Sequence, residues 1–155
     1  YQSHNLANID FNTYIQSLVV SLLRSYGVLV NAIAVNISVE NVSLSLDTAV
    51  PCGLLINELV SNALKHAFPI LDPSKGGKGE LTIRLRPLGQ DTYELIVRDN
   101  GIGMPPEADM AHPETFGLKL IAMLAKQLRG TLECRRNGGT EMRLVIREAD
   151  DQKRS

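Results

Sequence analysis

Apolar residues recur every three to four positions in three parts of the chain, and this spacing predicts amphipathic helices at residues 10–26, 47–67 and 116–130. Asp10 is a candidate N-cap of the first helix, and Gly27 follows its last apolar position. Pro51 fits the first turn of the second helix. Gly130 stands at the end of the third. Each predicted helix therefore has a recognisable end as well as an apolar face.

The other apolar segments alternate with polar positions, which is typical of strands with one buried face. Six strands are predicted, at residues 32–40, 42–47, 80–88, 92–99, 131–136 and 140–148. Each of the three helices is followed by one pair of strands. This order predicts an α+β fold, a two-layer sandwich with a mixed, mostly antiparallel sheet and helices on one face. Strict βαβ alternation is absent, so a doubly wound dinucleotide fold is not expected.

Two internal segments lack a clean periodicity. Residues 68–80 concentrate Pro, Gly and Ser, which is typical of a loop. Residues 99–117 form a second long loop, and loops of this length inside a compact domain are usually functional or mobile. We expect one domain at residues 10–147, a linker at residues 1–9 and a flexible tail at residues 148–155.

The composition is that of a soluble globular domain, with 44% apolar and 21% charged residues. The net charge of -1 gives no electrostatic reason to expect binding to nucleic acid or to an acidic membrane. Cys52 and Cys134 fit no metal-binding spacing, and we expect both to stay reduced. No apolar run approaches the ~20 residues that cross a bilayer. The sequence therefore predicts a cytoplasmic domain that does not contact membrane.

The stretch INELVSNALKHAFP (56–69) places Glu58, Asn62 and Lys65 along one line of the second helix. One interpretation is a solvated helix face. The other is a site, because a Glu–Lys pair seven residues apart does not stabilise a helix and Asn is a poor helix former. Such residues offer oxygen ligands for a hard cation and a point charge for phosphate. His66 follows directly and could face the same site, whereas we expect surface positions for the other two histidines.

Three further stretches carry glycines at places where chemistry is possible. In RDNGIGMP (98–105), Asp99 ends a strand, and the second of two closely spaced glycines exceeds what a turn needs. Gly117 begins a helix near Lys119, an arrangement suited to an anion, although a flexible hinge is an alternative. NGGT (137–140) alone indicates a hairpin turn. Neither a GxGxxG fingerprint nor a P-loop is present.

Taken in order, these four stretches resemble the ATP-binding catalytic domain of sensor histidine kinases, in the GHKL superfamily. ELVSNALKHAF resembles the N box, DNGIGMP the G1 box, FGLKL a reduced G2 box and GGT the late Gly-Thr element. The resemblance extends from about residue 9 to residue 146 and implies a Bergerat-type fold. The helix and strands before the N box are most similar to the subgroup with the second type of dimerisation domain.

The resemblance also implies roles for individual residues. Asn62 would be a Mg²⁺ ligand, and Glu58 would support the metal or act as a base on the attacking group. Lys65 would meet phosphate oxygens beside His66. Asp99 would accept a hydrogen bond from the adenine amino group. The other implied contacts to the nucleotide come from the loop glycines, apolar walls, the third helix and the last hairpin: Gly101, Ile102, Gly103, Met104, Gly117, Leu118, Lys119 and Thr140.

The function implied is that of a kinase catalytic domain. It would bind Mg·ATP and donate the γ-phosphoryl group to a histidine on a dimerisation domain of the same protein, outside this chain, with a response regulator downstream. Little turnover is expected from this domain alone. A GHKL ATPase or an anti-sigma-type serine kinase is the first alternative, since Glu58 is compatible with hydrolysis. A degenerate nucleotide-binding interaction module is the second, because the G2 box is reduced.

Overall fold

The computed structural model describes residues 2–28, 33–40, 42, 44–67, 79–101, 116–136 and 138–148, with backbone alone at 2–10 and 66–67. In chain order the elements are α1 (Gln2–Ser25), β1 (Ile33–Val39), α2 (Leu46–Asn62), the π-helix η1 (Ala63–Ala67), β2 (Gly79–Gly89), β3 (Thr92–Asp99), α3 (Phe116–Gln127), β4 (Thr131–Arg136) and β5 (Thr140–Arg147). Within the described residues, no helix has the length and apolar character needed to cross a membrane.

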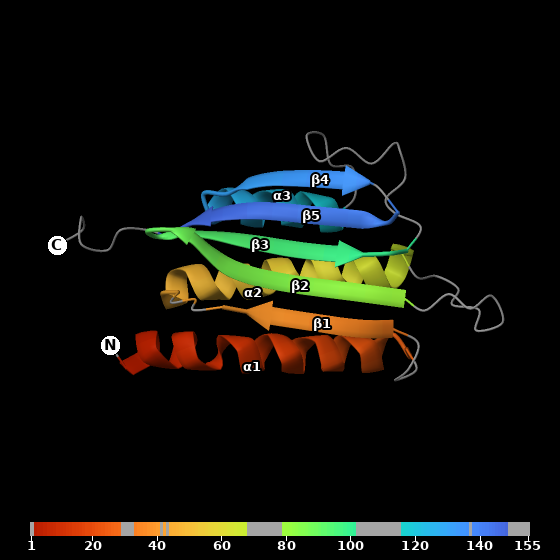
Figure 1. Ribbon diagram of the computed structural model, residues 1–155, viewed down its shortest axis with the longest axis horizontal. Coiled ribbons are helices and arrows are strands. Elements are labelled where there is room, and N and C mark those ends of the chain that lie inside the picture. The colour runs from red at the N-terminus through yellow and green to blue at the C-terminus, as the bar shows by residue number, and fades with distance from the viewer. Residues whose placement is uncertain are drawn as a thin grey trace.

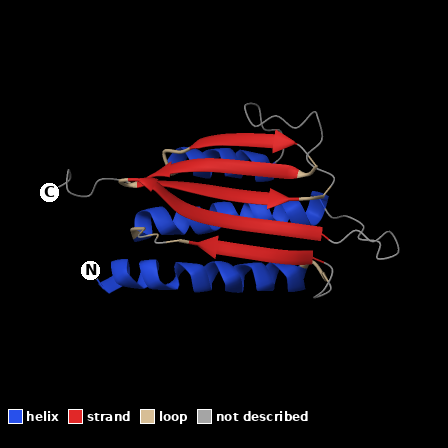
Figure 2. Ribbon diagram, viewed as in Figure 1, coloured by secondary structure: helices blue, strands red, loops and turns tan. Residues whose placement is uncertain are grey.

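The five strands form one mixed sheet in the order β1-β2-β3-β5-β4, with the helices stacked on one side of it (Figures 1 and 2). β1 pairs with β2 in parallel, and every other pairing is antiparallel. α2 lies between α1 and α3 in the helix layer (Figure 1). The expected two-layer α+β sandwich is confirmed.

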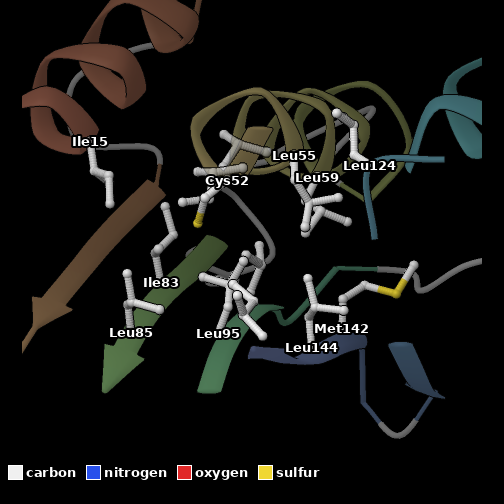
Figure 3. Packing of buried hydrophobic residues seen from close by; sticks show 14 of the residues in the cluster. Ile15, Cys52, Leu55, Leu59, Ile83, Leu85, Leu95, Leu124, Met142 and Leu144 are labelled. Atoms are coloured by element: carbon white, nitrogen blue, oxygen red, sulfur yellow. The ribbon is translucent and has the colours of Figure 1, made fainter. Parts of the chain in front are cut away.

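The core lies between the two layers and follows from the alternation of the strands. In β2, Leu81, Ile83 and Leu85 are all fully buried, and they point to the same face because successive strand residues alternate. α2 supplies Leu55 and Leu59 from the opposite layer (Figure 3). Cys52 and Cys134 form no disulfide, as expected. Burial raises the pKa of Cys52 to about 12, so this thiol is a core side chain and not a nucleophile.

The segment after β1 differs from the expected hairpin. Residues 42 and 44 belong to no strand, yet Val42 and Leu44 are buried. β1 instead pairs with the distant β2, and the Glu40 amide extends that ladder by donating to the Leu85 carbonyl at 2.9 Å. The alternating pattern of this segment therefore reflects the burial of Val42 and Leu44 and not strand pairing. The helix α2 begins directly afterwards, at Leu46.

α1 also begins earlier than expected. The helix starts at Gln2, so Asp10 lies within it and is not its N-cap. A residue that can cap a helix does not start one when the preceding residues can also be helical, and residues 2–9 contain neither Gly nor Pro. The assignment of residues 1–9 as an interdomain linker remains a prediction.

Both α1 and α3 end in a Schellman motif. The amide of Val28 donates to Leu23 at 2.9 Å around Gly27, whose φ of 66° is the left-handed conformation the motif requires. At the end of α3, Gly130 donates to Ala125 at 2.9 Å, but the left-handed residue is Arg129 with φ of 54°. The residue that ends the helix is therefore Arg129, one position before the expected Gly130.

Replacing Arg129 with glycine should stabilise the protein, because glycine adopts a left-handed conformation without the steric penalty of a Cβ atom. We expect the free energy of unfolding to rise by about 1 kcal/mol. Chemical denaturation of the wild type and Arg129→Gly measures the change. Lys126→Gly is the matched control, since it places glycine in the last turn of α3 and should destabilise by a similar amount.

The open face of the sheet carries a buried carboxylate that pairs with two partly exposed arginines. Glu94 in β3 is 4% exposed and accepts from Arg86 at 2.8 Å and from Arg143 at 2.5 Å. Burial alone would raise the pKa of Glu94, but the hydrogen bonds from the two guanidinium groups lower it below its ordinary value. Glu94 therefore ties β2, β3 and β5 together on the face that no helix covers.

Candidate functional site

The carboxyl end of β3 presents a buried carboxylate with a defined orientation. Asp99 is 7% exposed, and its Oδ1 accepts from the backbone amides of Gly101 at 3.0 Å and Thr140 at 3.3 Å. No described residue hydrogen-bonds its other oxygen, Oδ2. Burial raises the pKa of Asp99, although the two amide hydrogen bonds act in the opposite direction. One oxygen is therefore fixed, and the other can accept a hydrogen bond from a ligand.

The backbone around Asp99 is held on two sides. Asn100 extends the pairing of β3 with β2, since its amide donates to the Glu80 carbonyl at 3.2 Å and its side-chain oxygen accepts from the Glu80 amide at 2.6 Å. Thr140 is the cross-strand partner of Asp99 in β5 and is itself buried. Thr140, one of the implied nucleotide contacts, therefore lies next to Asp99, and its backbone amide donates directly to Asp99 Oδ1.

Gly139 packs against the same strand end more closely than any side chain could. A Cβ atom on Gly139 would lie 2.0 Å from the carbonyl oxygen of Asp99, and the φ of 137° is one that other residues rarely adopt. The local pattern of NGGT by itself indicated a hairpin turn. The close approach could not be read there, because it depends on the register that places Thr140 opposite Asp99.

A second group of oxygens gathers where the end of α2 meets the start of α3. A Cβ atom on Gly117 would lie 3.6 Å from Asn62 Oδ1 and 3.6 Å from Glu58 Oε2. These two side chains, one helical turn apart on α2, therefore converge on the first turn of α3. A carboxylate and an amide oxygen suit a hard cation such as Mg²⁺ that keeps several waters. Within the described part of the chain, no cluster of three or more His, Cys, Asp or Glu side chains could hold a metal ion.

Lys65 does not share this position. Asn62 is the last residue of α2, and Lys65 belongs to the π-helix η1, whose wider turn breaks the simple i, i+3, i+4 alignment of α2. The Lys65 ammonium lies over the ring of Tyr26, 5.9 Å from its centroid, on the flank where α1 ends. The single polar line expected from the sequence is thus divided between two flanks of α2.

The expected helix at residue 116 is confirmed, and the side chains of its first turn differ in burial. Leu118 is buried in the first turn, so it can contribute an apolar wall, whereas Lys119 is exposed. Phe116 is the most exposed large apolar residue of the described chain, at 80%. Ile102, Gly103, Met104 and the side chain of His66 lie outside the described residues, and their expected roles remain predictions.

The two groups of residues lie at one end of the molecule. β3 ends, β5 begins and η1 lies at the right-hand edge in Figure 1, and α3 starts at that edge. The carboxylate of Asp99 and the oxygens of Glu58 and Asn62 therefore belong to the same end of the domain. The N-terminus of α3 also lies at this end, and the positive end of its helix dipole favours an anion.

Comparison with known proteins identifies the family of this chain. Residues 48–150 match the family described as histidine kinase-, DNA gyrase B-, and HSP90-like ATPase. Blue-light-activated histidine kinase 2 of Erythrobacter litoralis is 30% identical over 116 residues, which are 74% of this chain and 32% of that protein. Sensor histidine kinase PdtaS of Mycobacterium tuberculosis is 32% identical over 106 residues, 66% of this chain and 20% of that protein. The chain therefore spans a third or less of these relatives.

Solved structures show the same fold. The Erythrobacter litoralis EL346 blue-light activated histidine kinase superposes with a TM-score of 0.78 at 26% identity, covering 92% of this chain and 43% of that one. The mycobacterial sensor histidine kinase MprB gives a TM-score of 0.66 at 17% identity, covering 87% and 93% of the two chains. Because the family model matches residues 48–150 and solved histidine kinase structures share the fold, this chain belongs to the family of histidine kinase-, DNA gyrase B- and HSP90-like ATPases.

Proposed function

We propose that this domain binds Mg·ATP and donates the γ-phosphoryl group to a histidine on a dimerisation domain of the same protein. The observation that carries the proposal is the convergence of two groups at one end of the sheet. Asp99 offers a fixed, buried acceptor suited to an adenine amino group. Glu58 and Asn62 offer oxygens beside the start of α3. One group would select the base, and the other would lie at the phosphates.

The chain's own residues would act by positioning and by charge. Asp99 Oδ2 would accept from the exocyclic amine of adenine, and Gly101 and Thr140 would hold the carboxylate in place. Asn62 and Glu58 would hold Mg²⁺, which neutralises phosphate charge when bound. The amides at the start of α3 would face phosphate oxygens. Phosphoryl transfer needs mainly in-line positioning and electrostatic stabilisation, so this arrangement suffices on the ATP side.

A histidine acceptor is favoured over hydrolysis by the relatives, which are named as sensor and light-activated histidine kinases. Those proteins are at least three times the length of the matched region, so the acceptor would lie elsewhere in the parent protein, with a response regulator downstream. Glu58 keeps the alternative of an ATPase open, since a carboxylate here could act on water. Transfer to histidine yields an acid-labile, base-stable phosphate, whereas a serine kinase yields an acid-stable one.

Asn62→Ala should weaken ATP binding in the presence of Mg²⁺ by about tenfold, equivalent to ~1.4 kcal/mol, because it removes a metal ligand. Adenosine binding should not change, since adenosine carries no phosphate or metal. Calorimetric titration with Mg·ATP and with adenosine measures both. Asn57→Ala is the matched control, an asparagine on the same helix that does not share the face of Asn62.

The outcome that contradicts the proposal is equally specific. Absence of Mg·ATP binding by the wild-type domain at millimolar concentrations would remove its basis. If the wild type binds but the parent protein forms no acid-labile phosphate, the ATPase alternative gains, and inorganic phosphate release should then be measured.

A further inference from the structure

The contact between Lys65 and Tyr26 has no part in the proposed chemistry, although Lys65 belongs to the stretch that carries Asn62. Lys65 Nζ lies 5.9 Å from the centroid of the Tyr26 ring, within the range of a cation–π interaction. Both side chains are exposed, Tyr26 at 37%. Tight packing therefore does not force the Lys65 ammonium against the Tyr26 ring. A lysine side chain of this kind otherwise has several rotamers available.

The position of Tyr26 is fixed by the end of α1. Its amide donates to the Leu22 carbonyl at 3.0 Å, and Gly27 and Val28 then complete the Schellman motif. The ring is therefore attached to a capped helix terminus and not to a free loop. Any displacement of the end of α1 would move the ring relative to η1.

The direction of Lys65 is opposite to that of the oxygen pair. Glu58 and Asn62 converge on Gly117 of α3, whereas Tyr26 adjoins α1, and α1 and α3 flank α2 on its two sides (Figure 1). An ammonium over the Tyr26 ring is thus turned away from the place where phosphates would lie. The π-helical turn at residues 63–67 permits this, since it separates Lys65 in phase from Asn62.

We propose that Tyr26 is a positioning residue that holds Lys65 away from the phosphates, so that the end of α1 sets how much of this positive charge reaches the nucleotide. The inference rests on the proposed function, because it requires phosphates beside Asn62. Lys65 has two positions in this scheme, one over the ring and one at the phosphates. ATP binding must break the first contact to make the second, and the energy of the cation–π contact opposes binding.

The test is a double-mutant cycle read by Mg·ATP and adenosine titrations of the wild type, Tyr26→Leu, Tyr26→Phe, Lys65→Met and Tyr26→Leu/Lys65→Met. Tyr26→Leu should bind Mg·ATP about two- to fivefold more tightly, because binding no longer has to break an exposed cation–π contact. Tyr26→Phe keeps the ring and should match the wild type. Adenosine affinity should not move in any variant. With Lys65→Met in place, Tyr26→Leu should have no further effect.

Three results would overturn the inference while leaving the proposed function standing: Tyr26→Leu binding Mg·ATP no more tightly than wild type, the gain persisting in the Lys65→Met background, or an equal gain for adenosine. No Mg·ATP binding by the wild type would remove the inference and the proposed function together. Thermal unfolding of each variant shows whether α1 keeps its end. If Tyr26→Leu unfolds, Lys65→Met decides the matter: it should weaken Mg·ATP binding because it removes the charge that reaches the phosphates, and unchanged affinity would overturn the inference.

Discussion

Asp99→Asn is expected to lower the affinity of the domain for ATP by about 10- to 100-fold while leaving its fold intact. The side-chain oxygen of asparagine can still accept from the amides of Gly101 and Thr140. The asparagine NH₂ group then replaces Oδ2. Both this group and the adenine amine are donors, so no hydrogen bond can form between them. A hydrogen bond to a charged group is lost, and the site rejects the base.

The same variant should be at least as stable as the wild type at neutral pH. Burial raises the pKa of Asp99, so the folded state binds this proton more tightly than the unfolded state does. The resulting stabilisation is fully present below the ordinary aspartate pKa and is lost as the pH rises through the raised pKa. Asparagine does not ionise, so the unfolding free energy of Asp99→Asn should lack this decrease with rising pH.

Binding depends on pH in the opposite sense. Oδ2 can accept a hydrogen bond from the adenine amine only while it is unprotonated, because protonation turns it into a donor. Adenosine affinity should therefore fall as the pH drops through the raised pKa of Asp99. The loss should begin at a less acidic pH than an exposed aspartate would give. Adenosine titrations from neutral to acidic pH, on wild type and Asp99→Asn, isolate the effect from the phosphates.

Asp91→Asn is the matched control, because Asp91 lies in the turn before the same strand and is exposed, with a φ of 56° that asparagine tolerates. It should change neither ATP affinity nor its pH dependence. Unchanged ATP affinity in Asp99→Asn would show that Oδ2 does not meet the base.

Strand alternation and helix spacing were sufficient for the elements that pack the core. Leu81, Ile83 and Leu85 are buried on one face as the period of two requires, and α3 begins at Phe116 as its apolar spacing predicted. Alternation could not tell a paired strand from a buried segment without strand pairing, so Val42 and Leu44 were assigned to a strand, although the structure places neither of these two residues in one. Pairing partners are set by tertiary contacts and not by the local pattern.

The candidate site was only partly visible for the same reason. Asp99 could be singled out because the turn that follows it carries a second glycine, Gly103, and Asn62 because asparagine is a poor helix former. Tyr26 lies 39 positions before Lys65, and no local feature of either residue indicates that they meet. The left-handed conformation of Arg129 is likewise imposed by the path of the chain into β4 and not by its own preference.

Gly139→Ala should have the largest effect on stability of any change to the last hairpin. The added methyl group would lie 2.0 Å from the Asp99 carbonyl oxygen and 2.9 Å from Asn100 Cα. Both are backbone atoms, so no rotamer change can relieve the overlap and the hairpin must move away from β3. Together with the strained φ of 137°, we expect a loss of roughly 2–5 kcal/mol in unfolding free energy.

ATP binding should be lost with it, since the displacement removes the Thr140 amide from Asp99 Oδ1 and frees the carboxylate to turn. Gly138→Ala separates this contact from backbone strain, because Gly138 has a φ of 65° but nothing within 4 Å of a Cβ atom. That control should lose only about 1 kcal/mol and keep its affinity for ATP. Equal denaturation midpoints for the two alanine variants would mean that the hairpin yields without strain and that Gly139 does not hold Asp99 in place. A low midpoint for Gly139→Ala with wild-type ATP affinity would instead confine its role to folding, so the two measurements together decide whether this glycine belongs to the nucleotide site.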